Sequence, residues 1–394
     1  MDSKSTDWAA VGFGLALAAF AAYQQFKLPA VLPALLAEYG YDRTLAGGFM
    51  SIYAVAGLAF SVLAGRLLER HDQARLILGA LALMAFGNLL GLTWPQAGGT
   101  MLVARGLEGI AFALFAIAGP VLANRNASAH HLPLVIGLTA AWIPAGQLIA
   151  ILSAPVALAR FGWQSLWWFG LFATAGLALW TLYLNHAGHS ALNARPASGA
   201  GDAPTLTPTQ RLGLLLSALI FFLWSTEFFA YMTWLPQYLV DVHGFSLNGA
   251  LAGYALPVAL VLVFNLIGGA LLRAGFAVGP MLAWSLALQA AVWLSLPVTG
   301  GGLTGLVSLI AYGVGAGITP TCLFALPSRL VESRRSASAF AIIMTGRNCG
   351  VLLGPVLMAE AVKRLGSWDA SGPLFGACTL LAMLLALGLA VRLR

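Results

Sequence analysis

Charged residues and cysteine are scarce in this sequence. Only 8% of the 394 residues are Asp, Glu, Lys or Arg, whereas an ordinary soluble domain carries roughly 25%. Hydrophobic residues make up 60% of the chain, and the mean hydropathy is +0.87. The three cysteines, Cys322, Cys349 and Cys378, are widely spaced within apolar runs, which argues against a disulfide framework and favours small apolar packing residues. The scarcity of charge excludes a soluble protein and indicates an integral membrane protein.

Long apolar runs separated by short polar segments extend through the whole chain. A helix needs about 20 mostly apolar residues to cross a bilayer, whereas barrel strands are short and alternate apolar with polar residues. These runs are apolar on all faces, and the first is too long for the apolar part of a secretory signal. The sequence therefore predicts an all-α integral membrane protein with twelve transmembrane helices. They are expected near 8–37, 44–65, 74–94, 99–123, 132–159, 163–184, 211–240, 247–272, 276–297, 302–328, 336–364 and 371–391.

Lys and Arg fall mostly on one side of this expected topology. If the N-terminus is cytoplasmic, thirteen of them lie in cytoplasmic segments and four on the opposite side, which is the bias typical of membrane proteins. We therefore expect a multi-pass cell-membrane protein, in a bacterial inner membrane, with both termini cytoplasmic. The topology also accounts for the net charge of +7, and no basic stretch interleaved with aromatic residues suggests a nucleic-acid partner.

The chain contains an internal repeat. The segment "LPALLAEYGYDRTLAG" from Leu32 resembles "LPQYLVDVHGFSLNGA" from Leu235, and Pro155 recurs as Pro355. Such self-similarity indicates a tandem duplication of six helices. The only long polar stretch lies between the copies and is rich in Ala, Gly, Pro, Ser and Thr, as in a flexible linker. We expect an N-terminal six-helix bundle over 1–184, a cytoplasmic linker over 185–210 and a C-terminal six-helix bundle over 211–394.

Several short motifs resemble those of the major facilitator superfamily. "GRLLERHDQAR" from Gly65 is similar to its signature between helices 2 and 3, "RGLEGIAFA" from Arg105 to its helix 4 motif, and "GVLLGP" ending at Pro355 to its Gly-Pro antiporter motif. The resemblance covers essentially the whole chain. It implies two pseudo-symmetric bundles that move a solute by alternating access around a midplane site. "FKLPAVLPALLAEYGYDRTLAG" and "YMTWLPQYLVDVHG" more weakly resemble the cyanate and nitrate/nitrite-type branches, which move small anions.

The resemblance also assigns a role to the loop after the second run. Gly65, Glu69, Arg70 and Arg75 fill the positions of the family signature. Charges at these helix ends, with a glycine that allows close approach, are expected to act as a conformational latch.

Ionisable residues within the apolar runs are candidates for function, because a charge at mid-bilayer costs a few kcal/mol and by default faces a partner or a cavity. Arg105 and Glu108 are three residues apart and share one face of a helix. Two alternatives stay open for them. They form an internal ion pair that braces the helix, or Arg105 contacts an anionic substrate and Glu108 carries a proton.

Glu227 is expected near the midplane of the seventh run, with Tyr231 one turn later and Gln24 as its counterpart in the first copy. Burial favours the uncharged form of an isolated carboxylate, which is the property that a proton-coupling residue requires. The alternative is a carboxylate permanently paired with Arg347 or Lys27. Tyr231 and Gln24 are candidate substrate contacts.

Two basic residues are further candidates for substrate binding. Arg347 lies inside the eleventh run, with Gln147 as its counterpart in the first copy, and we expect it to contact a substrate or a carboxylate. The neighbouring Asn348 points elsewhere on the helix and is expected to bond a neighbouring helix. Lys27 either extends to the outer interface or binds an anion.

Other motifs carry no predicted chemistry. "GVGAG" from Gly313 follows no strand, so close helix packing explains it better than nucleotide binding. The histidines lack acidic or cysteine companions, so we expect no metal and no cofactor, with a proton gradient as the energy source.

The residues thus predict a transporter and not an enzyme. The first hypothesis is a proton-coupled secondary transporter of a small anionic solute, functional as a monomer in membrane lipid. In it Lys27, Arg105 and Arg347 contact the anion and Glu227 or Glu108 carries the proton. The same charges also suit a proton-driven exporter of a drug-like, siderophore-like or other amphiphilic compound. A third alternative is a non-transporting membrane sensor on a transporter fold.

Overall fold

The structure is a computed structural model that describes residues 5–128, 130–131, 135, 138–139, 141–186, 206–331, 336–368 and 370–392. Within these ranges the side chains of residues 58, 61–62, 65–66, 69–70, 327–328, 336–338, 340–341 and 391–392 are outside the description. The described chain forms twelve α-helices and no β-strand. Eleven of these helices are long and apolar enough to cross a membrane. The prediction of an all-α membrane protein is confirmed.

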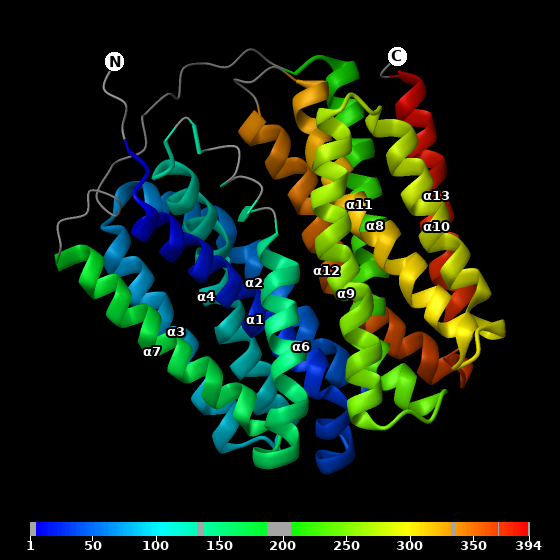
Figure 1. Cartoon of the computed structure of the whole chain (residues 1–394), viewed down its shortest axis with the longest axis horizontal. Coiled ribbons are helices and arrows are strands. Elements are labelled where there is room, and N and C mark those ends of the chain that lie inside the picture. Colours follow the sequence, from blue (N-terminus) through cyan, green and yellow to red (C-terminus); the bar gives the residue numbers. More distant parts are fainter. Residues whose placement is uncertain are drawn as a thin grey trace. The chain divides into compact units, whose positions relative to one another are not determined.

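Residue contacts divide the chain into two compact units, Met1–Ala197 and Ser198–Arg394. In Figure 1 the first unit runs from blue to green and the second from green to red. The first contains α1 (Trp8–Tyr39), α2 (Arg43–Arg70), α3 (Gln73–Thr93), α4 (Gly98–Arg125), α6 (Trp142–Phe161) and α7 (Gln164–His186). The second contains α8 (Pro208–Asp241), α9 (Leu247–Arg273), α10 (Val278–Ser295), the 3₁₀ turn η1 (Leu296–Val298), α11 (Leu303–Leu330), α12 (Ser336–Leu365) and α13 (Ser371–Arg392).

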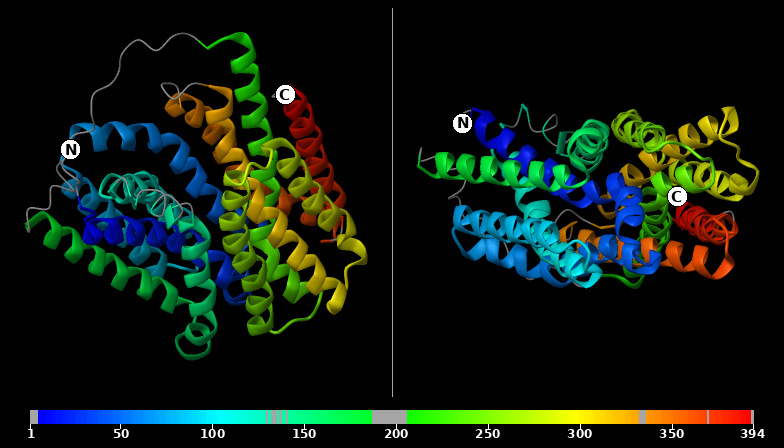
Figure 2. Two further views of the ribbon diagram at one scale, coloured as in Figure 1. Left: turned by 45° about the horizontal axis from the view of Figure 1, so that its top comes forward. Right: turned by 90° about the horizontal axis from the view of Figure 1, so that it is seen from below.

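Equivalent helices pair in the two units. In the first unit α1 packs along α6, α2 along α4 and α3 along α7, and in the second α8 packs along α12, α9 along α11 and α10 along α13. Figure 2 shows each group of six helices from two further directions. The order of pairing repeats, as a duplicated six-helix bundle requires. Residues 187–205 of the predicted linker lie outside the described residues, and α6, the fifth predicted run, begins at Trp142.

The ends of the helices explain where some of the few acidic residues lie. Asp7, Asp42 and Asp72 precede α1, α2 and α3, and each side chain accepts a hydrogen bond from a backbone N–H of the first turn. After α1 and α8 the chain reverses at Gly40 and Gly244, which have φ angles of 62° and 63°. This left-handed backbone favours glycine, and it recurs at the same place in both units.

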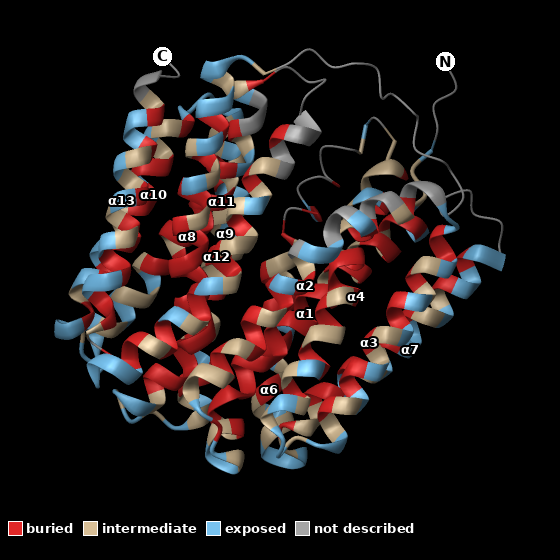
Figure 3. Cartoon of the chain, turned by 180° about the vertical axis from the view of Figure 1, so that it is seen from behind, coloured by how far each residue is buried: buried red, intermediate tan, exposed pale blue. Residues whose placement is uncertain are grey.

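Burial differs among the helices of each unit. In the most apolar segment of α1 and of α8, about two thirds or more of the residues are buried. In the corresponding segments of α7 and α13, a third of the residues are buried. Figure 3 shows this contrast as long buried stretches on α8 and mainly exposed or intermediate positions on α13. Large apolar side chains such as Phe172 and Leu179 of α7 are exposed, as expected for helices that face lipid. α1 and α8 therefore form the interior of their units and carry several of the candidate site residues.

A stripe of glycines lets α12 lie directly against α8. Gly346, Gly350 and Gly354 recur at every fourth position, and a Cβ atom on any of them would overlap the backbone of α8. The contacted carbonyl oxygens include those of Ala218 and Thr226. Small residues at this spacing allow two membrane helices to approach closely.

The first unit repeats the stripe in weaker form on α6. Gly146 presses against α1 at the carbonyl of Ala19, and Ala150 and Ala154 follow at the same spacing, both fully buried. Glycines of "GVGAG" on α11 also press on neighbouring helices, Gly313 and Gly317 on α9 and Gly315 on α10. The prediction that this motif serves helix packing is confirmed.

Candidate functional site

Lys27 lies at the centre of a buried polar cluster in the first unit. Its ammonium group donates to Gln24 Oε1 at 2.7 Å, Asn88 Oδ1 at 2.7 Å and Glu108 Oε1 at 3.0 Å. It also lies 4.3 Å from the centre of the Trp167 ring. The side chain is fully buried, and its three N–H donors match these three acceptors. Lys27 is therefore held inside the unit in this conformation and does not extend to an interface.

Glu108 links Lys27 to Arg105. Its second carboxylate oxygen, Oε2, lies 2.5 Å from Arg105 Nη1 and accepts a hydrogen bond of 2.8 Å from the Tyr53 hydroxyl. The Arg105 guanidinium also stacks over the Tyr53 ring at 4.1 Å. Two cations thus share one carboxylate, so the cluster keeps a formal charge of +1. The internal ion pair, one of the two alternatives from the sequence, is present in the structure.

Arg105 also completes the hydrogen bonding of α1. Pro29 has no N–H, so the carbonyl of Gln25, four residues earlier, lacks its usual helical donor. Arg105 Nη2 donates to that carbonyl at 3.0 Å, and Nη1 donates to the carbonyl of Gln24 at 2.9 Å. Unpaired carbonyls in a membrane interior are costly. The geometry therefore supports a bracing role for Arg105 at the proline of α1.

Loss of the Glu108 carboxylate is expected to destabilise this cluster. Glu108→Gln leaves Lys27 and Arg105 buried without a carboxylate, and breaking such a buried pair costs about 3–5 kcal/mol. We expect a correspondingly large fall in the free energy of unfolding, measured by thermal unfolding of the protein in detergent.

The surface pair of Glu360 and Arg364 on α12 provides the matched control. Their contact of 3.1 Å involves an Arg364 side chain that is 80% exposed, so Glu360→Gln should change stability by at most about 1 kcal/mol. The double variant Lys27→Met/Glu108→Gln restores the formal charge of the cluster to +1 and should recover part of the loss. Equal small shifts for Glu108→Gln and Glu360→Gln would show that the cluster does not stabilise the unit.

Glu227 of α8 has a different environment in the second unit. Its Oε2 atom accepts hydrogen bonds from Trp293 Nε1 of α10 at 2.7 Å and from the Tyr312 hydroxyl of α11 at 2.8 Å. Its Oε1 atom is buried and has no hydrogen-bond partner among the described residues. Tyr231 stacks on Tyr312 with ring centres 3.6 Å apart and meets Trp293 edge-on at 5.5 Å. Glu227 therefore lies in an aromatic enclosure, and within the described chain neither Arg347 nor Lys27 pairs with it.

Arg347 of α12 is the third buried cationic side chain among the described residues, and the groups that it contacts there are neutral. Its Nη1 atom donates to Asn348 Oδ1 at 3.1 Å, and the guanidinium carbon lies 5.6 Å from the centre of the Phe229 ring. The described residues place no carboxylate within ion-pair distance of it. Unlike Lys27 and Arg105, Arg347 keeps 9% of its surface exposed. Asn348 Oδ1 thus accepts from the adjacent arginine, and the expected hydrogen bond from Asn348 to a neighbouring helix stays a prediction.

The remaining predicted residues are the two glutamines Gln24 and Gln147 and the residues of the predicted latch. Gln147 of α6 is buried, and Gln24 Oε1 accepts from Lys27 while its Nε2 atom is buried without a partner in the described chain. Arg75 is exposed at the start of α3, with its Nε atom 3.8 Å from Asp72 Oδ2. The side chains of Gly65, Glu69 and Arg70 lie outside the described residues, so the latch stays a prediction.

Several residues of the two clusters were missed from the sequence. Asn88 and Tyr53 surround the first cluster, and Trp293 and Tyr312 surround Glu227. Asn88 is a lone amide within an apolar run and could have been flagged as an intramembrane polar residue. The aromatic residues gave no signal, because 11% of this chain is aromatic.

Fold and clusters together define a class of protein: a multi-pass helical membrane protein of two equivalent six-helix units, each with ionisable groups in its interior. The sequence profile described as Major Facilitator Superfamily matches residues 14–355, and the chain belongs to this superfamily. Membership indicates a transporter rather than an enzyme.

Two curated relatives are similar to this chain at low sequence identity. One is "Probable anion transporter 2, chloroplastic" of Oryza sativa subsp. japonica, 22% identical over 277 residues that cover 63% of this chain and 50% of the relative. Another is "Probable sulfoacetate transporter SauU" of Cupriavidus necator, 27% identical over 188 residues that cover 44% of each chain. The chain thus spans about half the length of the curated relatives it matches.

Proposed function

We propose that this protein is a proton-coupled secondary transporter that moves a small anionic solute across a bacterial inner membrane by alternating access. One observation carries the proposal. The second unit contains an arginine, Arg347, without a carboxylate partner and a carboxyl group, Glu227, without a cation, among the residues that the structure describes. Arg347 supplies the positive charge for an anion, and Glu227 supplies a group that can take up and release a proton. The names of both relatives, an anion transporter and a sulfoacetate transporter, support this substrate class.

The contrast between the two units supports Glu227 as the proton carrier in this proposal. Glu108 already has two cations that offset its charge, so a proton would compete with both. At Glu227 a negative charge meets only two neutral donors, and a carboxylate without a cation is costly away from water. A bound proton removes that cost. Lys27 and Arg105 then serve to hold α1 in shape, and Arg347 is the anion contact.

A second candidate function is a proton-driven exporter of amphiphilic compounds. The observation that favours it is the aromatic enclosure of Glu227, since aromatic rings around a carboxylate suit a cationic or zwitterionic organic molecule. In this case the cation would displace the proton directly at Glu227.

Transport by purified protein in proteoliposomes tests both proposals. An inwardly directed proton gradient should drive uptake of at least one member of a panel of sulfonates, phosphate, and mono- and dicarboxylates, and a protonophore should abolish it. An exporter would instead move a cationic dye against the proton flow. Empty liposomes are the control, and a folded protein that moves none of these solutes would contradict transport as the function.

A further inference from the structure

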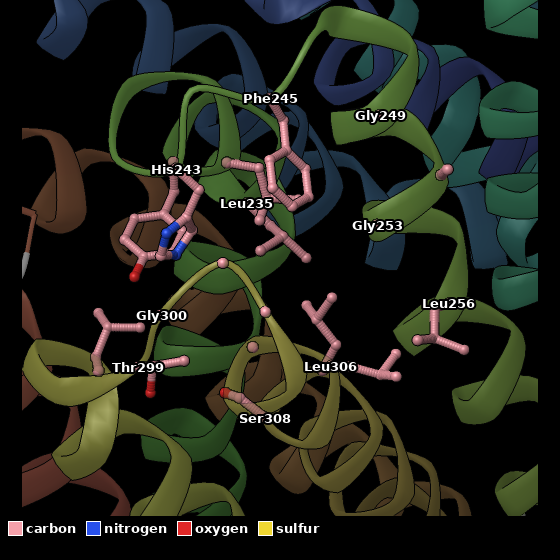
Figure 4. Close-up of a pocket in the computed structure, with 18 of the residues that line it drawn as sticks. Leu235, His243, Phe245, Gly249, Gly253, Leu256, Thr299, Gly300, Leu306 and Ser308 are labelled. Atoms are coloured by element: carbon pink, nitrogen blue, oxygen red, sulfur yellow. The ribbon is translucent and has the colours of Figure 1, made fainter.

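A cavity of about 350 Å³ lies at one end of the second unit, where α8 turns into α9 and where η1 leads into α11. Tyr231, Tyr238, His243 and Phe245 contribute rings to its lining, and Gly300–Gly302 contribute open backbone. Figure 4 shows Phe245, Leu235, Leu256 and Leu306 around the space, with His243 and Thr299 toward one side. No lysine, arginine, aspartate or glutamate lines the cavity in the described part of the chain.

One residue that lines the cavity, Tyr231, also belongs to the aromatic enclosure of Glu227. Tyr231 lines the cavity and stacks directly on Tyr312, whose hydroxyl donates to Glu227 Oε2. Two aromatic rings therefore separate the cavity from the buried carboxyl group. The described contacts thus connect Glu227 to the cavity through Tyr312 and Tyr231.

The cavity has the size and polar groups that water needs. A water molecule occupies about 30 Å³ and binds two to four polar partners, so 350 Å³ holds on the order of ten waters. Polar groups in the lining belong to Tyr231, Tyr238, His243, Thr299 and Ser308, together with the glycine backbone.

We infer that this cavity is the entry route for protons to Glu227, with the stacked rings of Tyr231 and Tyr312 as its inner gate. The inference rests on the proposed proton coupling. When Tyr231 swings aside, water reaches the Tyr312 hydroxyl. The Tyr312 oxygen accepts a proton from hydronium in the cavity while its own O–H proton passes to Glu227 Oε2. The carboxylate becomes a carboxylic acid, and Tyr312 is regenerated.

Among the described residues, three other titratable groups interact with Glu227. Tyr231 lies on its own helix, Tyr312 on α11 and Cys378 on α13, while α10 contributes Trp293. Of these, only Tyr231 lines the cavity.

Infrared difference spectroscopy tests the route without a substrate. The protein in lipid is transferred from H₂O to D₂O, and the exchange of the carboxyl proton of Glu227 is followed. The carboxyl C=O band of Glu227 is the band that Glu227→Gln removes, and its shift reports exchange of the proton. Gly302 lines the cavity and a Cβ there meets no atom within 4 Å, so Gly302→Trp should be accommodated and add a large ring to the cavity lining. We expect it to slow the exchange by about tenfold or more, whereas Gly302→Ala, the matched control, should exchange as the natural protein does.

Several outcomes separate the inference from the proposed function. If the band is present and Gly302→Trp exchanges as fast as Gly302→Ala, the route is wrong but proton binding by Glu227 stands. If Glu227→Gln removes no carboxyl band, the proposed proton carrier fails and the inferred route fails with it. Ser308→Leu, compared with Ser308→Ala, fills the same cavity from α11 should Gly302→Trp fail to fold. Tyr231→Ala removes the gate and should have the opposite effect, faster exchange.

Discussion

Replacement of Glu227 by Gln is expected to abolish proton-driven accumulation while solute exchange continues. Gln keeps the size of the side chain and an oxygen that can accept from Trp293 and Tyr312, so the aromatic enclosure should persist. It cannot gain or lose the proton. In proteoliposomes the variant should equilibrate labelled solute between the two sides at a rate close to that of the natural protein, yet fail to concentrate it under a pH gradient.

Two comparisons make this result specific to Glu227. Glu360→Gln removes a carboxylate from the exposed end of α12 and should leave accumulation intact. Tyr312→Phe removes one donor to Glu227 Oε2 but retains the carboxyl group, so it should weaken coupling without eliminating it. Continued accumulation by Glu227→Gln, at a gradient that drives the natural protein, would remove Glu227 from the coupling mechanism.

Replacement of Arg347 by Gln is expected to cause the largest loss of anion affinity. The variant installs at α12 the residue that the first unit has at the equivalent position, Gln147, so the helix should tolerate it. Removing one partner of a desolvated charged contact costs about 2–5 kcal/mol, which corresponds to roughly 30-fold or more in affinity. The loss can be measured as the disappearance of thermal stabilisation by the transported anion, because a ligand that binds the folded state raises its stability.

Arg347→Lys is the informative control for this prediction. It retains the positive charge but loses the planar, bidentate geometry of the guanidinium, so we expect intermediate affinity. Cationic dyes should be unaffected by either variant if they bind at Glu227. An anion affinity that is unchanged in Arg347→Gln would show that the anion binds elsewhere.

The sequence was sufficient for the architecture and for the list of buried ionisable residues, but only in part for their pairing. Apolar runs of sufficient length fixed the helices because a bilayer permits little else, and the recurrence of Pro155 as Pro355 exposed the duplication. The spacing of Arg105 and Glu108 allowed an ion pair, but nothing in the sequence placed Lys27 beside the same carboxylate. Only the folded unit shows that Lys27 and Arg105 share Glu108 while Arg347 shares nothing ionic within the described residues.

The contact of Arg105 with α1 illustrates why pairing escaped the sequence. Its partners include the backbone carbonyl of Gln25, which is available because of Pro29 four residues later. The proline was visible in the sequence, but the donor to the Gln25 carbonyl, Arg105, lies 80 positions after Gln25 on another helix. The enclosure of Glu227 by Trp293 and Tyr312 is hidden for a similar reason, because aromatic residues on α10 and α11 meet α8 only after the bundle forms.

The glycine stripe of α12 has a consequence for coupling. Gly346, Gly350 and Gly354 bring the backbone of α12 onto the backbone of α8, and this close approach resists sliding of one helix past the other. The two helices should therefore travel as one rigid lever during any rearrangement of the protein. Arg347 is on one of these helices and Glu227 on the other, so a bound anion and a bound proton would be carried by the same moving part.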